Sequence, residues 1–340
     1  MISGHAGKAL ALPADGVNYT LDPPSAGRVP GRAVMTMLGS AHARFLGLFR
    51  NPADARQLAL GVMGVPALLL PFALSTNIAL EILTWMAVWG FIYRHNYILH
   101  NHVHCPFMKS RWLNRLIGAL LGFCTGMTVG QWKITHIHGH HVEHKLQYLP
   151  SRRYIEPLNV GEKRPFSVRA GIIHALKTAP LQWIIPTRVM VAGAFGRSKL
   201  RRKFYRFYLL ELVTIYAIAG SLTFINPWKG VFYFGLVYAQ VYLLSRYVDY
   251  LTHASSQGES TYSIANICLD AKYNKLFWNF GYHVAHHIKP SAHWTTLPSL
   301  HGSLAVSPEA GRTAIESNLF GFFAPPAFLW YRVRDAAGRQ

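Results

Sequence analysis

The stretch GYHVAHH, residues 281–287, places three imidazoles within five residues. Two similar clusters lie upstream, HNHVH at residues 100–104 and HIHGHH at residues 136–141. Long, mainly apolar segments separate the three clusters along the chain. Neutral imidazole is the commonest metal ligand that proteins offer near neutral pH. Three clusters gathered by one fold therefore predict a metal site.

The composition indicates a membrane protein. Of the 340 residues 51% are hydrophobic and 14% are charged, against roughly 25% charged in a typical soluble domain. Lys and Arg number 34 and Asp and Glu 14, a net charge of +20. The basic residues flank apolar segments and form no recognisable DNA-binding motif, so a nucleic-acid partner is not expected. The three cysteines form no C-x-x-C pair, which argues against a disulfide framework or a zinc ribbon.

Four apolar segments are near the ~20 residues that a helix needs to cross a bilayer. They predict an all-α integral membrane fold with four transmembrane helices in two hairpins. Glu81 lies inside the second of these segments, where it would either line a substrate channel or reach water near the helix end. The expected spans are about 56–75, 77–97, 205–226 and 229–250.

The remaining segments complete the expected domain organisation. Residues 116–129 are apolar but short and Gly-rich, which favours a re-entrant or interfacial segment. Residues 171–195 are expected at the membrane surface, with a fifth crossing as the alternative. The expected boundaries are a disordered arm over 1–32, an interfacial helix over 33–50, the main domain over 51–320 and a C-terminal tail over 321–340.

The basic residues predict the orientation. Eighteen Lys and Arg lie between residues 98 and 206, six in residues 1–56 and seven after residue 250. The hairpin turns contain only Lys229. By the positive-inside rule both termini and the central loop face the cytoplasm. All three histidine clusters then lie on that side, although the histidines were not used to assign it.

The spacing within each cluster suits shared metal ligands. In a helix, residues four apart point to one face, as His100 and His104 would, and His136 and His140. The adjacent His141 adds a further ring, and residues 283–287 provide three more at H-x-x-H-H spacing. Eight or more imidazoles exceed the four ligands that one zinc takes. They suit two iron ions, which imidazole binds well.

The clusters and their flanking residues resemble the three histidine boxes of the membrane fatty acid desaturase family. The first is HNHVHCPF (100–107) followed by RWLNRLIG (111–118), the second runs from Trp132 to His141, and the third is NFGYHVAHHIKP (279–290). The similarity extends from about residue 56 to 300. It implies a non-haem diiron site that activates dioxygen and introduces a double bond into an acyl chain. It also implies a cytosolic helical cap that holds this site above four transmembrane helices.

The resemblance implies nine iron ligands, one of them a histidine just beyond the last span. They are His100, His104, His136, His140, His141, His253, His283, His286 and His287. Asp249 stands where family members often have Asn, and would either coordinate iron or hydrogen-bond a ligand's far nitrogen. His95 is an alternative to His104, because His95 and His100 form an H-x4-H spacing that the family also uses. His102 and His138 lie inside the boxes and are expected to face solvent or to support a ligand.

The resemblance predicts a desaturase acting on an acyl-lipid, acyl-CoA or acyl-carrier substrate. Two electrons must come from a separate ferredoxin or cytochrome, because the chain has no Rossmann, flavin or fused haem-domain motif. A hydroxylase or carotenoid oxygenase of the same superfamily is the alternative, and a haem-binding or metal-handling membrane protein is a distant one. The bacterial inner membrane is the expected location, ahead of the endoplasmic reticulum.

Overall fold

The structure, a computed structural model, describes residues 45–74, 77–141, 168–253, 265–304, 313–316 and 332–335. Its regular elements are helices, apart from two short strands that pair antiparallel, β1 (Thr313–Glu316) and β2 (Arg332–Asp335). The prediction of an all-α fold therefore applies to the described residues up to 304, and this small sheet, whose first strand lies inside the expected main domain, departs from it. The expected arm at 1–32 lies outside the described residues, as does most of the expected interfacial helix at 33–50.

The first hairpin consists of α2 (Asp54–Ala73) and α3 (Ile78–His104). Asn77 begins α3, since its side-chain oxygen accepts a hydrogen bond from the backbone N–H of Leu80 at 2.9 Å. With 27 residues, α3 is about 40 Å long and exceeds the roughly 30 Å of bilayer hydrocarbon. Its last turns, which carry the first histidine cluster, can therefore extend beyond a membrane.

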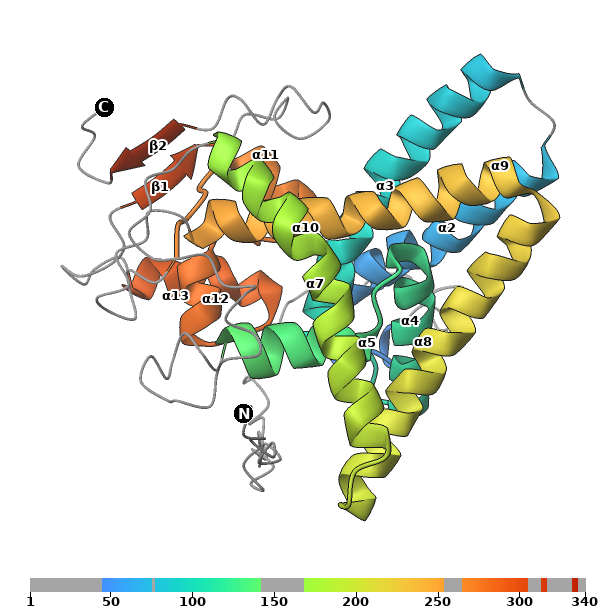
Figure 1. The fold of residues 1–340 in the computed structure, drawn as a ribbon. Helices are drawn as coiled ribbons and strands as arrows, with labels where there is room; N and C mark the ends of the chain where they lie inside the picture. The colour runs from blue at the N-terminus through green and yellow to red at the C-terminus, as the bar shows by residue number, and fades with distance from the viewer. Residues whose placement is uncertain are drawn as a thin grey trace, which may run out of the picture.

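The second half of the helical domain contains α7 (Val168–Ala194), α8 (Lys199–Ile225) and a rod of three consecutive helices. Helix α7 packs against α8 and against α10 (Val237–His253). The short α9 (Pro227–Gly230) and the π-helix η3 (Val231–Leu236) precede α10, and the three elements form one long rod across the molecule (Figure 1). Asn226 begins this rod by accepting a hydrogen bond from the Lys229 N–H, directly before a proline at the first helical position.

Two helices, α2 and α8, are long and apolar enough to cross a membrane. A third crossing is possible if α4 (Arg111–Thr125) and the segment formed by α5 (Val129–Trp132) and η1 (Lys133–His141) count as one span bent by 89°. That bend agrees with a re-entrant or broken segment near residues 116–129. The four-span arrangement is not confirmed, because α10 has only 17 residues and α3 is not apolar enough over a membrane-spanning length.

The turns of the two hairpins are tied together by Glu81. Its carboxylate pairs with Lys229 at 3.4 Å and accepts a hydrogen bond from the Tyr233 hydroxyl at 2.7 Å. The Lys229 ammonium also donates to the backbone oxygens of Pro71 and Leu74 at the end of α2. The two turns are thus neighbours at one end of the helices. Glu81 therefore joins the two hairpins.

The helices α11 (Ala271–Leu276), α12 (His283–Ile288), η4 (Trp294–Thr296) and α13 (Leu297–Leu304) lie at the other end of α3 and α10 (Figure 1). The chain before α2 is attached on the same side, through backbone hydrogen bonds between Arg50 and Phe107 and between Lys109 and Leu48. A core containing Tyr97, Phe107 and Phe277 packs between these helices and α3. The histidine-bearing ends of α3 and α10 are held in this core.

Candidate metal centre

Two long helices deliver ligands from their C-terminal ends. His100 and His104 lie one turn apart on α3, and their ring centroids are 4.8 Å apart. His253 is the last residue of α10 and is buried. Because both helices belong to the hairpins, the membrane-side packing fixes the position of these three rings.

The second histidine cluster lies on a π-helix. Residues 128–131 start this segment with a capping box, in which Thr128 and Gln131 each accept a hydrogen bond from the other's backbone N–H. The following nine residues form η1, where the wider π turn holds three rings on one side. These rings are His136, His140 and His141, and their centroids lie 4.5–5.5 Å apart.

The third cluster is held by a tight loop before α12. Trp278 and Asn279 both have positive φ, 49° and 61°, and the Asn279 side chain donates to the backbone oxygen of Trp294 at 3.0 Å. Gly281 follows, where a Cβ would lie 2.1 Å from the backbone oxygen of Cys268. Only glycine fits this close approach. The loop therefore fixes the start of α12 and the direction of its histidines.

The nine histidines converge from four elements, and eight of them form two four-histidine groups. Within each group the ligand nitrogens lie within 4.8 Å of one another. The first, named the α3 group, consists of His100, His104, His136 and His286. The second, named the α10 group, consists of His140, His253, His283 and His287. Both η1 and α12 supply ligands to both groups, so these two short helices link the two positions.

His141 lies between the two groups. Its Nε2 is 3.1 Å from Nε2 of His136 and 3.0 Å from Nε2 of His286, both in the α3 group. Its ring centroid is also 4.6 Å from that of His287, in the α10 group. The structure thus brings all nine predicted ligands together, eight as two sets and one between them.

Burial favours the neutral form of four of these imidazoles. Desolvation, and then the repulsion of neighbouring imidazoles, holds the pKa of His100, His136 and His141 well below the usual value. Desolvation and then His286 lower the pKa of His104 in the same way. A neutral imidazole keeps a lone pair for a metal ion, so the rings are in the state that coordination requires.

The donor set fits two iron ions. Each group offers four imidazole nitrogens around one point, and imidazole is a good ligand for iron. His104 supports this fit, because its buried Nε2 has no hydrogen-bond partner among the residues described. A buried polar atom of this kind is normally paired, and a metal ion would satisfy it.

Three other histidines of the first two boxes lie outside both groups. His95 packs one helix face away, with Nδ1 3.2 Å from the Phe91 oxygen and its ring against Gly64. His102 accepts a hydrogen bond from the Phe107 N–H at Nδ1 and donates from Nε2 to the Asn114 oxygen, so it fastens the turn after α3. His138 is exposed. The geometry therefore favours His104 over His95 in the first box.

Asp249 lies beside the α10 group and not inside it. Its Oδ1 is 3.7 Å from Nδ1 of His140, the nitrogen that points away from the ligand cluster, and its Oδ2 accepts from Arg246 at 3.0 Å. Arg246 is also buried and donates from Nε to Thr178 at 3.1 Å. This arrangement favours the supporting role for Asp249, in which a carboxylate orients a metal-bound imidazole.

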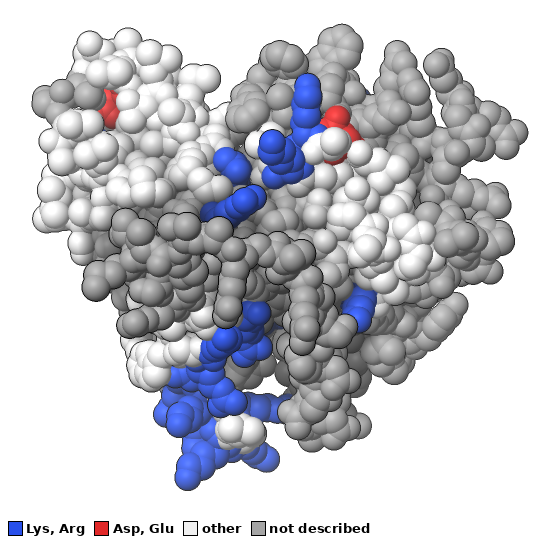
Figure 2. Space-filling model, turned by 180° about the vertical axis from the view of Figure 1, so that it is seen from behind, with Lys and Arg blue, Asp and Glu red and all other residues white. Residues whose placement is uncertain are grey.

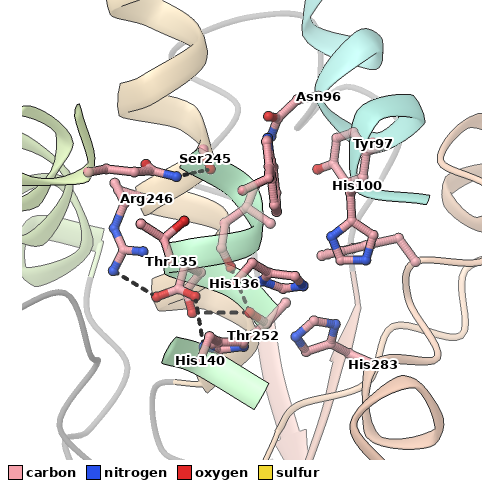
Figure 3. Close-up of a pocket in the computed structure, with 15 residues that line it drawn as sticks. Asn96, Tyr97, His100, Thr135, His136, His140, Ser245, Arg246, Thr252 and His283 are labelled. Atoms are coloured by element: carbon pink, nitrogen blue, oxygen red, sulfur yellow. Dashed lines mark hydrogen bonds and ion pairs between the residues drawn. The ribbon is translucent and has the colours of Figure 1, made fainter. Parts of the chain in front are cut away.

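A small pocket opens beside both groups. His100 and His136 of the α3 group and His140 and His283 of the α10 group face it (Figure 3). Sequence reasoning missed its other polar residues, which come from several helices and carry no motif. They are Asn96, Thr135, Gln182, Ser245, Arg246 and Thr252.

Together these features define a helical protein in which histidines of four separate elements form two clusters able to hold metal ions. The family model for fatty acid desaturase matches residues 75–317, which include all nine histidines and more than half of the chain. The chain belongs to the fatty acid desaturase family. A search of curated proteins found no match to it. The family is membrane-associated and oxidoreductive, in agreement with the apolar helices and the metal-binding histidines.

Proposed function

We propose that this protein is a membrane-bound fatty acid desaturase that uses dioxygen, two iron ions and two external electrons. The observation that carries the proposal is the pair of four-histidine groups beside one pocket, in a chain of this family. Two bound iron ions would supply the oxidation that removes hydrogen from an unactivated methylene.

The chain's own residues would hold the metals and exclude water. His100, His104, His136 and His286 would hold one ion, and His140, His253, His283 and His287 the other. His141 contacts both groups and would ligate whichever ion it reaches. The pocket walls formed by Tyr97, Trp132 and Phe280 would shield the reacting carbon from bulk water.

We place four spans in the membrane, with both termini and the metal centre in the cytoplasm. The contact of Lys229 with Glu81 and with the end of α2 supports this topology, because it puts both hairpin turns at one end of the helices. The histidine-bearing ends of α3 and α10 are opposite those turns. The surplus of basic residues flanking the spans supports this orientation, and we keep the bacterial inner membrane as our preferred location.

A separate ferredoxin-like protein or cytochrome would deliver the electrons. The positive charge of +20 supports an acidic partner that is guided by electrostatic attraction. Figure 2 shows the densest group of Lys and Arg at the α7–α8 turn. We name this surface the basic end, and it contains Arg197, Lys199, Arg201, Arg202, Lys203 and Arg206.

Two measurements test the function. Purified protein should contain about two iron ions per chain and should show no haem absorbance. Haem absorbance, or clearly less iron, would contradict the proposal and favour a haem-binding or metal-handling role. Expression in a host of known lipid composition should yield a new unsaturated fatty acid that a His286→Ala variant does not make. A new hydroxy acid would identify a hydroxylase, and an oxidised carotenoid a carotenoid oxygenase.

A further inference from the structure

The pocket beside the metal centre is more polar than an ordinary acyl chain requires. A methylene chain has no hydrogen-bonding atom, and channels for such chains are lined mainly by apolar side chains. Here Asn96, Thr135, Gln182 and Ser245 line the same space as the ligand histidines (Figure 3). These residues suggest that the substrate carries a polar group near its reacting carbon.

Gln182 is the clearest example. It lies on α7, and its side chain is held from one end, where Nε2 donates to Ser245 at 3.3 Å and contacts Met127 sulfur at 3.7 Å. Gln182 is only 4% exposed, yet its Oε1 accepts no hydrogen bond from any residue that the structure describes. Buried amide oxygens are normally paired, so this acceptor calls for a ligand.

Asn96 presents a second acceptor from a different helix. It lies four residues before His100 on α3, and therefore on the same helix face as that ligand. It is 6% exposed, and within the described part of the chain its Oδ1 has no hydrogen-bond partner. Two independent helices thus contribute buried amide side chains to the lining of one pocket.

The charges around the pocket favour a neutral ligand. Arg246 and Asp249 are the charged residues that line it, and they pair with each other at 3.0 Å. A carboxylate or phosphate in the pocket would meet an arginine that is already neutralised and an aspartate that repels it. A neutral hydroxyl or amide meets no such opposition.

We infer that the substrate carries a hydroxyl or an amide N–H close to the carbon that is oxidised, and that Asn96 and Gln182 accept hydrogen bonds from it. The substrate class is then a hydroxylated or amide-linked acyl lipid. This inference rests on the proposed function for the identity of the reacting chain. A site built to pair a donor rejects the analogue that lacks it, because its own polar atoms are left unpaired.

Binding to the purified full-length protein tests the inference without turnover. The ligands are stearate and a positional series of hydroxystearates, together with one acyl chain linked either as an amide or as an ester. Tryptophan fluorescence titration in non-ionic detergent gives each Kd. We expect at least one ligand with a donor to bind about tenfold tighter than its partner without one. Equal affinities throughout would overturn the inference.

Matched variants locate the selectivity. Gln182→Met and Asn96→Leu should each abolish most of the preference, whereas Gln240→Met should retain it, because Gln240 is a partly buried glutamine of α10 outside the pocket lining. A preference that survives both pocket variants would place the donor elsewhere and contradict the inference. If a variant does not fold, the wild-type comparison still decides.

Product analysis separates this inference from the proposed function. A plain acyl chain desaturated as readily as a hydroxylated or amide-linked one would leave the function standing and remove the inference. Selective binding of ligands with a donor, with no oxidised product from any of them, would overturn the proposed function and leave the ligand class of the pocket in place.

Discussion

At the scale of single residues, the first histidine box gives the sharpest prediction. His104 belongs to the α3 group and His95 does not, although the sequence allows either as a ligand. His104→Ala should therefore lose much of its bound iron and its activity. His95→Gln should retain about two irons per chain. Metal analysis of the purified proteins measures both.

The two variants also control for each other, because both replace a histidine of α3 in the same part of the fold. Thermal unfolding would show whether His95→Gln loosens the contact with Gly64, while metal analysis shows whether the iron is retained. Loss of iron in His95→Gln, together with retention in His104→Ala, would reverse the assignment.

Asp249 gives a second prediction at this scale. Asp249→Asn removes the charge beside His140 Nδ1 and the ion pair with Arg246. Loss of such support for a ligand typically lowers metal affinity roughly 10- to 100-fold. We expect iron to leave the α10 group first in a chelator titration, with the α3 group less affected. Glu81→Gln, at the opposite end of α3, is the control, and equal behaviour of the two variants would contradict the supporting role.

Spacing and the resemblance predicted all nine histidines that the structure brings together, because ligand chemistry restricts both residue type and interval. The same spacing could not exclude His95 or His102, since helical periodicity does not say which face meets the other clusters. Asn96 and Gln182 could not be predicted either. They have no motif, and only the packing of α3 and α7 against α10 brings them to the pocket.

At the scale of elements, the π-helix η1 can be tested directly. It holds His136, His140 and His141 on one side by its wider turn. Inserting an alanine after Gly139 should turn His140 and His141 by roughly 100° about the helix axis, away from His136. We expect loss of iron with an unchanged helical circular dichroism signal. Gly139→Ala keeps the length of η1 and is the matched control, and full metal content in the insertion variant would contradict the role of η1 in aligning the three rings.

The tie between the hairpins gives a prediction on stability. Lys229→Met would leave the Glu81 carboxylate, which is 15% exposed, without its charged partner. We expect a loss of about 2 kcal/mol in the free energy of unfolding, between the values for exposed and buried pairs. Thermal unfolding in detergent measures it. The double variant Glu81→Gln/Lys229→Met should recover part of the loss, and strictly additive effects would show that the pair does not interact.

Each expected span overlaps a helix of the structure, but the helix ends differ from the expected bounds. The expected spans at 77–97 and 229–250 are parts of α3, which continues to His104, and of the rod from Pro227 to His253. Polar residues at the histidine-bearing ends concealed these extensions, because hydropathy falls where a helix leaves the apolar region. The two π-helices were not predicted, since the sequence pattern of a π turn differs little from that of an α-helix.

At the scale of the whole molecule, two features meet at the metal centre. The hairpins fix the ends of α3 and α10, while η1 and α12 each supply both groups. Neither group can therefore form without both halves of the chain. The ligand spacing within each of the three distant clusters made it possible to predict one shared site from the sequence. The pocket beside the two groups has no such pattern and could not be predicted.

The proposed attraction of an electron donor depends on the charge of the whole protein surface, and it yields a final prediction. If the positive charge guides an acidic donor, reduction by a ferredoxin should slow steeply with added salt, since screening shortens the range of the attraction. Neutralising Arg197, Lys199 and Lys203, three exposed residues of the basic end, should slow it roughly tenfold at low salt. Reduction by dithionite should be unchanged in this variant, which controls for damage to the metal centre.

Assays in non-ionic detergent exclude a contribution from anionic lipid. A ferredoxin rate independent of ionic strength would exclude electrostatic guidance, and a salt-dependent rate that the variant leaves unchanged would move the docking surface away from the basic end.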